Sequence, residues 1–481
     1  MLPACGETAP EPAPSETSSI AEAPPQEEIS TETEPAASGI EAIACGGRDY
    51  VILNVKTTEN YNGHPYPEFT SAEQNGEPLN DAVFARNLAI SEKYDLNLVS
   101  LESDDVAGNA KKLILSGDGG LDLVCHLIAD GFPLASQGLL CEMNGLPVVD
   151  FSTAYWMQYV KSDTSIGGKN YFLSGMVDLS TLNGVGIAYM NKKLAEEYGI
   201  GLMYDTVREG GWTYDVMLSA SSKVQDDLDG DGVLGAEDRV GIDCSSFAWQ
   251  PLFYGSGNLF IKKDESDLPY FEEADETIYD TLVRVIEILN NDTTTLNVNH
   301  IKTTEDLGGL TVRRFREDKA LFFIELIYGV PPLRDMDSDF SLLPMPKASE
   351  EQKEYATYIH VQKATAMAVP ATVSGDGLTL AGSILGDLAF ESAKIIQPVF
   401  YDIMLKSKFS RDEESSAMLD IIYANIRTDI ALAMLTSGIN IDSELRSACT
   451  AGDTAIVSKL ASNKKVYEKV LTKLIEQLNG Q

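Results

Sequence analysis

One stretch of the chain has the residue types and spacing of a calcium-binding loop. Asp227, Asp229 and Asp231 alternate with other residues, and a glycine follows where such loops turn sharply. Calcium prefers six or more hard oxygen ligands, and alternate carboxylates in a tight turn bring them together. We expect a structural Ca²⁺ in loop 227–238, with an Asp-Gly turn that binds no metal as the alternative. The expected ligands are Asp227, Asp229, Asp231, Val233 through its carbonyl, and Asp238, which stands where a glutamate is usual.

A second set of residues could bind a small polar molecule. Sugars present apolar faces that stack on aromatic rings, and hydroxyls that pair with carboxylates and amides. The stacking candidates are Trp156, Trp249 and Tyr328, followed by Tyr61, Tyr155 and Tyr254, and the polar candidates are Asp130, Gln250 and Glu325. For each residue the alternative is a packed core aromatic or a capping carboxylate.

Motifs that would indicate catalysis are missing from the sequence. It contains no Gly-x-Ser-x-Gly, no phosphate-cradling loop and no His-Glu-x-x-His, and its four histidines are scattered. Pairs of carboxylates are inevitable among 74 acidic residues, but none falls in an acid–base motif. We therefore expect no catalytic residues and no enzymatic activity.

The elements that must position these candidates begin with an alternating pattern. Apolar runs predict strands at 50–55, 95–99 and 121–128, and amphipathic stretches predict helices at 80–93 and 104–116. Strands that alternate with helices are typical of a doubly wound sheet. Because ligands of such sheets bind beyond the carboxyl ends of the strands, Asp130 falls where a ligand would lie.

Further along the chain the pattern predicts additional elements. We expect a strand at 184–190 and helices at 213–224, 273–290 and 306–317. The run 319–324 is expected to be a strand that returns to the first lobe, and 366–369 another crossing between lobes. The region 378–476 reads as nearly all helix, packed on the second lobe.

Several short stretches together resemble a known family. They are Gly117–Val124, Leu134–Gln158, Ala188–Leu194, Gly211–Asp215, Leu343–Lys347 and Ala368–Pro370. They are similar to extracellular solute-binding proteins of bacterial ABC importers, in the family that includes maltose- and oligosaccharide-binding proteins. The resemblance covers roughly residues 48 to 450.

The resemblance implies an α/β fold of two lobes, the type II periplasmic-binding-protein-like fold. Each lobe would be a mixed sheet flanked by helices, with a hinge of several crossings and a helical C-terminal region. The N-terminal lobe would comprise 48–155 and 305–365, and the C-terminal lobe 156–304 and 366–481, with the calcium-type loop. A monomer would capture a solute, most simply a carbohydrate, between the lobes and deliver it to the permease subunits of an ABC transporter.

Composition limits the other classes. The chain has 36 Lys plus Arg against 74 Asp plus Glu, a net charge of −38, which repels nucleic acid. No run of 18 apolar residues occurs, so no membrane span is expected. Of the six cysteines, those other than Cys5 have no metal-type spacing and are expected to be free thiols, with a bridge between Cys125 and Cys141 as the alternative.

The N-terminal residues Met1–Gly6 resemble the tail of a bacterial lipoprotein signal peptide. Lipids on Cys5 would hold the protein on the outer face of the cytoplasmic membrane. Residues 6–47 are rich in Glu, Pro, Ser, Thr and Ala and contain no Lys or Arg, a composition typical of a disordered acidic tether. Region 1–47 is therefore expected to connect a membrane anchor to the folded body.

Two other functions stay open at this point. An extracellular glycan-active enzyme would need two carboxylates that face each other across the site, about 5–5.5 Å or about 6.5–9.5 Å apart. A cell-surface assembly module is suggested by the dockerin-like loop 227–238, although dockerins normally carry that loop twice.

Overall fold

The computed structural model describes part of the chain, and everything reported below concerns that part. The chain divides into two units, Met1–Ser38 and Gly39–Gln481, and the fold is that of the second unit. Cys5 and Tyr61 lie outside the described residues, and so do the predictions made for them. The described residues are 37–58, 68–117, 119–177, 179–272, 275–329, 331–333, 336–406, 413–435 and 438–480.

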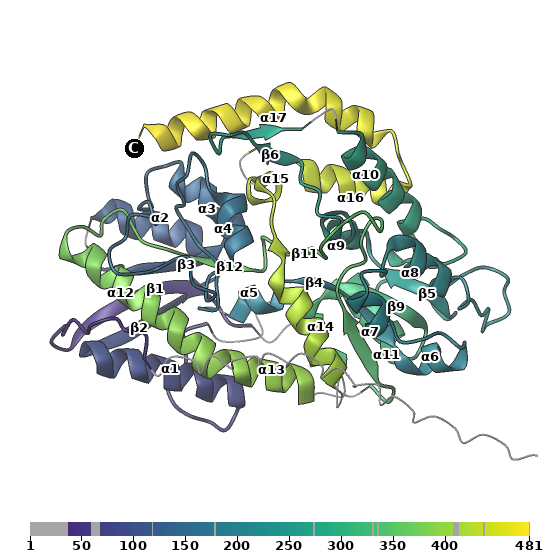
Figure 1. The fold of residues 1–481 in the computed structure, drawn as a ribbon, viewed down its shortest axis with the longest axis horizontal. Coiled ribbons are helices and arrows are strands. Elements are labelled where there is room, and N and C mark those ends of the chain that lie inside the picture. Colours follow the sequence, from purple (N-terminus) through teal and green to yellow (C-terminus); the bar gives the residue numbers. More distant parts are fainter. Residues whose placement is uncertain are drawn as a thin grey trace, which may run out of the picture. The chain divides into compact units, whose positions relative to one another are not determined.

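Figure 1 labels most of the elements. The strands are β1 (Arg48–Val55), β2 (Leu96–Ser103), β3 (Leu123–Leu127), β4 (Gly186–Asn191), β5 (Val240–Cys244), β6 (Ile261–Lys263), β7 (Pro269–Phe271), β8 (Thr295–Asn297), β9 (Ala320–Leu326), β10 (Phe340–Leu343), β11 (Thr357–Tyr358), β12 (Thr365–Ala368) and β13 (Ile426–Arg427). The helices are α1 (Pro78–Tyr94), α2 (Val106–Ser116), α3 (Ile128–Ala135), α4 (Gln158–Thr164), α5 (Leu179–Asn183), α6 (Lys192–Glu197), α7 (Tyr204–Arg208), α8 (Tyr214–Ser221), α9 (Trp249–Gly255), α10 (Glu276–Leu289), α11 (Leu307–Arg316), α12 (Asp376–Glu391), α13 (Gln397–Lys406), α14 (Glu413–Ala424), α15 (Ile430–Ala433), α16 (Ile441–Ala451) and α17 (Ile456–Asn479).

The first sheet has the strand order β12-β3-β1-β2. Strand β1 pairs in parallel with β2 and with β3, and β12 pairs antiparallel with β3. Parallel neighbours need a crossover, and α1 and α2 supply one each between these strands. The predicted alternation of strands and helices at the start of the chain is confirmed.

The second sheet has the strand order β10-β4-β9-β5-β8. Its central strand β9 is buried along its whole length, antiparallel to β4 and parallel to β5. The expectation that 319–324 returns to the first lobe is therefore wrong. An apolar run buried on both faces suits the centre of either sheet, and the sequence alone does not choose between them.

The segment that follows β11 also differs from expectation. Residues 366–369, expected to be a crossing, lie mainly in β12, so they belong to the first sheet. Helix α12 was expected on the second lobe, but it packs on the first sheet, because Leu380, Ile384 and Leu388 share a buried cluster with Ile52 of β1. The crossing itself lies just before β12.

We call residues 359–364 the crossing segment, because its hydrogen bonds reach both sheets. On the second-sheet side, the His360 N–H donates to the carbonyl of Gly184, which lies just before β4. On the first-sheet side, Ile128 N–H donates to the Ala364 carbonyl, and Ala129 N–H to the Val361 carbonyl. A Cβ on Gly184 would lie 3.1 Å from that of Ala364, so glycine permits this close approach.

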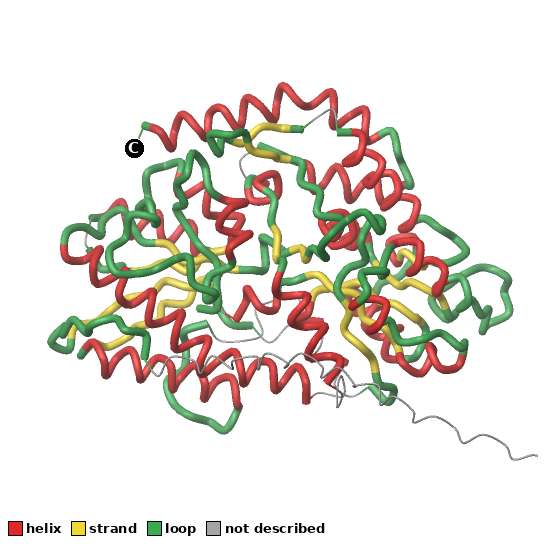
Figure 2. The backbone as a smooth tube through the Cα atoms, viewed as in Figure 1, coloured by secondary structure: helices red, strands yellow, loops and turns green. Residues whose placement is uncertain are grey.

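Helical connections join the two sheets elsewhere. Beyond α12 the chain continues through α13 to α14, which packs on β10 of the second sheet. Helix α17 packs on α10, α16 and β7, and the carbonyl of Leu478 near its end accepts from the Tyr171 hydroxyl. The two large sheets lie apart with helices around them (Figure 2), so the expected fold of two lobes and several crossings is confirmed. Strands β6 and β7, and strands β11 and β13, form two further sheets of two strands each. Among the described residues, no helix combines the length and apolarity that crossing a bilayer requires.

Candidate functional site

A carboxylate, a tyrosine and a lysine lie together at the carboxyl end of β9. Glu325 is the penultimate residue of that strand, Tyr328 follows in a short 3₁₀ turn, and Lys363 comes from the crossing segment. The Lys363 Nζ atom lies 5.8 Å from the centre of the Tyr328 ring. Burial lowers the pKa of Lys363, and the charge of Glu325 opposes this change. An ammonium group is therefore held between a carboxylate and an aromatic face.

Aromatic and cationic groups continue this site along the edge of the second sheet. The rings of Phe247 and His360 are stacked with their centres 5.3 Å apart, and the Arg446 guanidinium lies 5.5 Å from the centre of the Phe247 ring. Arg446 Nε donates to both carboxylate oxygens of Asp442, at 3.0 and 2.9 Å. Burial and the charges of Arg446 and Lys363 lower the pKa of His360 to about 3, so its imidazole is neutral at pH 7.

We call Phe247, Glu325, Tyr328, His360, Lys363 and Arg446 the edge cluster. Strands β5 and β9 are parallel, so the residues that follow them emerge at the same edge of the sheet. Phe247, Tyr328 and Lys363 are half-buried, so they combine fixed positions with partial access to solvent. Because the cations of this cluster have carboxylates beside them, the cluster suits a neutral polar molecule that stacks on a ring and accepts or donates hydrogen bonds.

Among the sequence candidates, Glu325 and Tyr328 are thus brought together. Asp130 lies at the carboxyl end of β3, as expected, but in the first turn of α3. This helix begins at Ile128, and it contains Pro133. Burial and then the charge of Asp105 raise the pKa of Asp130 to about 6. Asp130 is therefore a poorly solvated carboxylate at the edge of the first sheet.

The two tryptophan candidates are core residues in this structure. Trp156 is 2 % exposed and packs edge-on against Phe151, at a centroid distance of 4.9 Å. Trp249 is 0 % exposed, and its indole N–H donates to Asp442. Neither ring offers a free face to a ligand here, which corresponds to the packed-aromatic alternative.

The remaining candidates are also held by protein contacts. The side-chain amide of Gln250 donates to Asp442 at 2.6 Å, and the buried Tyr254 stacks on Tyr358 with ring centres 5.3 Å apart. Tyr155 is half-buried against Phe390, away from the edge cluster residues. Through Asp442, the buried Gln250 and Trp249 support the position of Arg446 in the cluster.

Sequence reasoning missed Phe247, His360, Lys363 and Arg446. They come from the 3₁₀ turn that follows β5, from the crossing segment and from α16, and only the long-range pairing of the strands brings them together. Phe247 could have been found from the sequence, because it is an aromatic residue just after Val240–Cys244, a short run that forms a strand. Lys363 and Arg446 carry no local signal, because isolated basic residues are common on solvated surfaces.

Loop 227–238 brings three of its aspartates together. Single carboxylate oxygens of Asp227, Asp229 and Asp231 lie within 4.8 Å of one another, and all three residues are exposed. A hydrogen bond from the Asp231 backbone lowers the pKa of Asp229, but desolvation and neighbouring carboxylates outweigh it, and the net pKa is raised. Asp238 differs in being buried, and its two oxygens accept from the backbone N–H groups of Leu228 and Gly235. Asp227 also accepts with both oxygens, from the N–H groups of Gly230 and Gly232, but it is exposed. Three carboxylates thus fit a cation, while Asp238 closes the loop.

The described cysteines are free thiols. Cys125, Cys244 and Cys449 are buried, whereas Cys45 and Cys141 are half-buried. The alternative of a Cys125–Cys141 bridge is therefore wrong for this structure. Strand β3 holds Cys125 in the sheet, and the Cys141 thiol donates instead to the carbonyl of Pro370.

Comparison with solved structures gives the fold a context. The chain is similar to the cyclic α-maltosyl-1,6-maltose binding protein from Arthrobacter globiformis, with a TM-score of 0.59 and 14% identity over 89% of this chain and 99% of that one. It is also similar to UspC of M. tuberculosis, with a TM-score of 0.58 and 12% identity over 88% of this chain and 100% of that one. A cyclo/maltodextrin-binding protein complexed with maltotetraose gives a TM-score of 0.55 and 13% identity over 90% of this chain and 96% of that one. No protein-family model matches the chain, and no curated protein matches it. Similarity at this identity confirms the expected two-lobed α/β fold.

Proposed function

We propose that this chain is an extracellular solute-binding protein that captures a neutral carbohydrate and delivers it, chemically unchanged, to an ABC transporter. The observation that carries the proposal is the edge cluster, in which half-buried rings and charge-compensated polar groups share one edge of a two-lobed fold. The likeness to the cyclic α-maltosyl-1,6-maltose binding protein and to the cyclo/maltodextrin-binding protein complexed with maltotetraose supports the carbohydrate class.

In this proposal Tyr328 and Phe247 offer faces to the apolar side of a sugar ring. The Glu325 carboxylate accepts hydrogen bonds from the hydroxyls of the sugar, and the Lys363 ammonium group donates to them. The neutral His360 holds the Phe247 ring in place by stacking on it. Asp130 contributes from the edge of the first sheet. A ligand that touches both lobes stabilises the closed arrangement over the open one, and the crossing segment is a hinge about which the lobes move.

A binding and turnover experiment tests this function. Neutral oligosaccharides are titrated by calorimetry and thermal shift, with a hydrolysis assay on the same samples. We expect tight binding of at least one glycan without products. Appearance of products would transfer the assignment to a glycan-active enzyme, and absence of any binding would remove the carbohydrate class.

Two tyrosine variants connect the ligand to the edge cluster. Tyr328→Ala removes a stacking face and should weaken binding by about 10-fold, the size of one aromatic contact. Tyr270→Ala removes a tyrosine that is 39 % exposed on β7 and serves as the matched control. Equal affinities of the two variants would place the ligand elsewhere.

We also propose the structural calcium ion in loop 227–238. The convergence of Asp227, Asp229 and Asp231 supports it, because a divalent cation would relieve the mutual repulsion of their carboxylates. Calcium at 100 times its dissociation constant should stabilise the protein by about 2.7 kcal/mol. Asp229→Ala should abolish the calcium-dependent rise in melting temperature, whereas Asp264→Ala in the β6–β7 turn should preserve it. An identical melting temperature in calcium and in chelator would contradict the proposal.

The location at the membrane is likewise a proposal. It rests on the sequence around Cys5, and mass spectrometry of the protein purified from its native membrane would detect the expected lipids. A membrane-free protein with an unmodified Cys5 would remove the anchor without affecting solute capture.

A further inference from the structure

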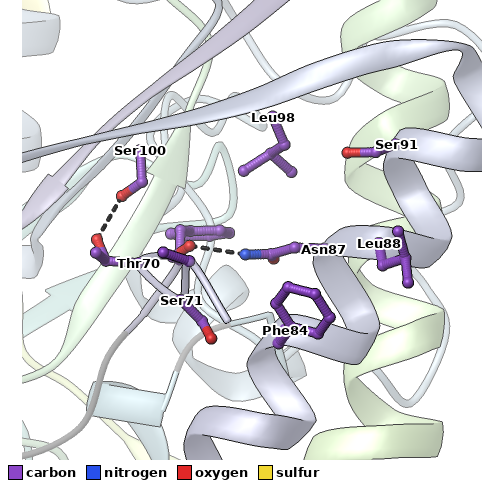
Figure 3. Close-up of a pocket in the computed structure, with 10 residues that line it drawn as sticks. Thr70, Ser71, Phe84, Asn87, Leu88, Ser91, Leu98 and Ser100 are labelled. Carbon is purple, nitrogen blue, oxygen red and sulfur yellow. Dashed lines mark hydrogen bonds between the residues drawn. The ribbon is translucent and has the colours of Figure 1, made fainter. Parts of the chain in front are cut away.

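A ligand-sized pocket lies on the first sheet, between α1 and β2. Its volume is about 320 Å³, and its walls come from loop 69–72, from one face of α1 and from Leu98 and Ser100 of β2 (Figure 3). This volume is at the small end of ligand pockets, which suits a single ring rather than an oligomer. We call it the α1–β2 pocket.

One part of the wall of this pocket is apolar. Phe84 and Leu88 of α1 and Leu98 of β2 line it (Figure 3), and so does Phe69. Leu88 is 45 % exposed, and Phe84 is only half-buried. Apolar side chains that line a hollow without filling it form a surface on which an apolar face gains contact area.

The rest of the wall carries hydroxyl groups arranged by buried partners. The amide of Asn54, which is fully buried, donates to Ser100 Oγ at 2.7 Å, and Ser100 Oγ lies 2.7 Å from Thr70 Oγ1. When Ser100 donates to Thr70, the proton of the exposed Thr70 hydroxyl is free to be donated to a ligand. The Ser91 hydroxyl points into the pocket from α1 (Figure 3).

The loop that forms the pocket is fixed in place. The Asn87 amide donates to the Phe69 carbonyl at 2.7 Å, and the buried Arg86 donates to the Glu68 carbonyl at 2.6 Å. The Ser71 hydroxyl donates to the Asn80 carbonyl at 3.0 Å. A site held in this way needs little reorganisation on binding.

None of the ten residues that line the pocket carries a charged side chain. We infer that the α1–β2 pocket is a binding site for a small neutral ring that carries hydroxyl groups, of the size of one monosaccharide or cyclitol. The apolar wall takes one face of the ring, and Thr70, Ser91 and Ser100 exchange hydrogen bonds with its hydroxyls.

This pocket is distinct from the edge cluster. In the first sheet, β2 forms one edge and β12, which follows the crossing segment, forms the other. Strand β2, which lines the pocket, and strand β12, which follows the crossing segment of the edge cluster, are three strand spacings of about 4.8 Å apart, or roughly 14 Å. No residue lines both sites.

The test uses the whole chain and a panel of probes: D-glucose, D-galactose, myo-inositol and, as a charged counterpart, D-glucuronate. Saturation-transfer NMR and calorimetry are recorded for the native chain and for Tyr328→Ala, which removes a face of the edge cluster. We expect one neutral probe to bind with a dissociation constant of about 1 mM or tighter in both proteins. Thr70→Val, which keeps the shape and removes the hydroxyl, should weaken this binding about 2- to 10-fold.

A second variant fills the pocket. Ser91→Phe should abolish binding of that probe, while Ser458→Phe on exposed α17 should leave it unchanged. The inference is overturned if no neutral probe binds below about 10 mM, if D-glucuronate binds equally well, or if Tyr328→Ala removes the binding. Should Ser91→Phe not fold, an unaltered affinity of Thr70→Val would overturn it alone.

Discussion

The edge cluster and the α1–β2 pocket solve the problem of holding a small polar molecule in different ways. The edge cluster takes its side chains from parts of the chain that are up to 199 residues apart, Phe247 and Arg446, and it places cations beside carboxylates. The pocket takes its residues from the single stretch 69–100 and offers only hydroxyls, an amide and apolar faces.

This difference predicts how each site fails. Where cations and carboxylates compensate one another, loss of one partner leaves a poorly solvated charge and disturbs the whole group. Where neutral groups are held by local hydrogen bonds, the loss of one group removes only its own contact. Substitutions in the edge cluster should therefore change both the stability and its pH dependence, whereas substitutions in the α1–β2 pocket should change the stability less and its pH dependence not at all.

The largest effect is expected for Glu325→Ala in the edge cluster. Glu325 is buried, and its charge is the one that favours the ammonium form of Lys363. Its removal should lower the free energy of unfolding by about 1–3 kcal/mol, measured by urea denaturation. Glu265→Ala, in an exposed turn, is the control and should change it by less than about 0.5 kcal/mol. Equal losses in both variants would mean that charge compensation does not hold the cluster together.

The second effect concerns pH and His360. Its pKa in the folded protein is about 3, below the ordinary value of 6.5 for histidine, so between these pH values unfolding takes up a proton. Stability from this group is complete above pH 6.5 and is lost as the pH falls towards 3, by up to about 1.36 kcal/mol per pH unit. His360→Asn should remove this part of the slope in denaturation experiments at pH 4 to 7.

A comparison of variant with native protein is necessary, because other groups titrate in the same range. His126, buried in β3 of the first sheet, has a pKa of about 4 and changes stability in the same direction. The raised pKa values of Asp130 and Asp429, about 6 and about 7, act in the opposite direction. If His360→Asn and the native protein have the same slope, His360 is not buried in its neutral form.

The two regions also differ in how far they could be predicted from sequence. Glu325 and Tyr328 were found because a strand end is a local signal. Their partner Lys363 was not, because the crossing segment meets β9 only after the second sheet has formed. The same lack of long-range information explains why β9 was assigned to the first lobe and why Trp249, which is buried, was a candidate for stacking on a ligand.

In the pocket, the local signal itself misled. Periodicity in 80–93 predicts that Val83, Phe84, Leu88 and Ile90 face the core. Val83 and Ile90 do, but Phe84 and Leu88 line the pocket beside β2, the last strand of the sheet. Apolar periodicity shows which side of a helix faces a sheet, and it does not show where that sheet ends.

A smaller effect is expected for Ser100→Ala in the pocket. Ser100 connects Asn54 to Thr70, and the Asn54 amide keeps a second acceptor in the Leu101 carbonyl at 3.3 Å. The free energy of unfolding should therefore fall by only about 0.5–1.5 kcal/mol, less than for Glu325→Ala. Thermal and urea unfolding measure the difference, and a larger loss than in Glu325→Ala would reverse the comparison.

The smallest effect is the most discriminating one. None of the residues lining the α1–β2 pocket titrates, and its proposed ligand is neutral, so its affinity for the neutral probe should be constant from pH 5 to pH 8. Asp130, which the proposed function adds to the edge cluster from the first lobe, has a pKa of about 6 and takes up a proton in this range. If Asp130 accepts a hydrogen bond from the captured glycan, the affinity for that glycan should fall as the pH decreases. Titrations of both ligands at pH 5, 6.5 and 8, repeated with Asp130→Asn, measure this difference. A pocket affinity that follows pH in parallel with the edge cluster would mean that the two ligands share one site.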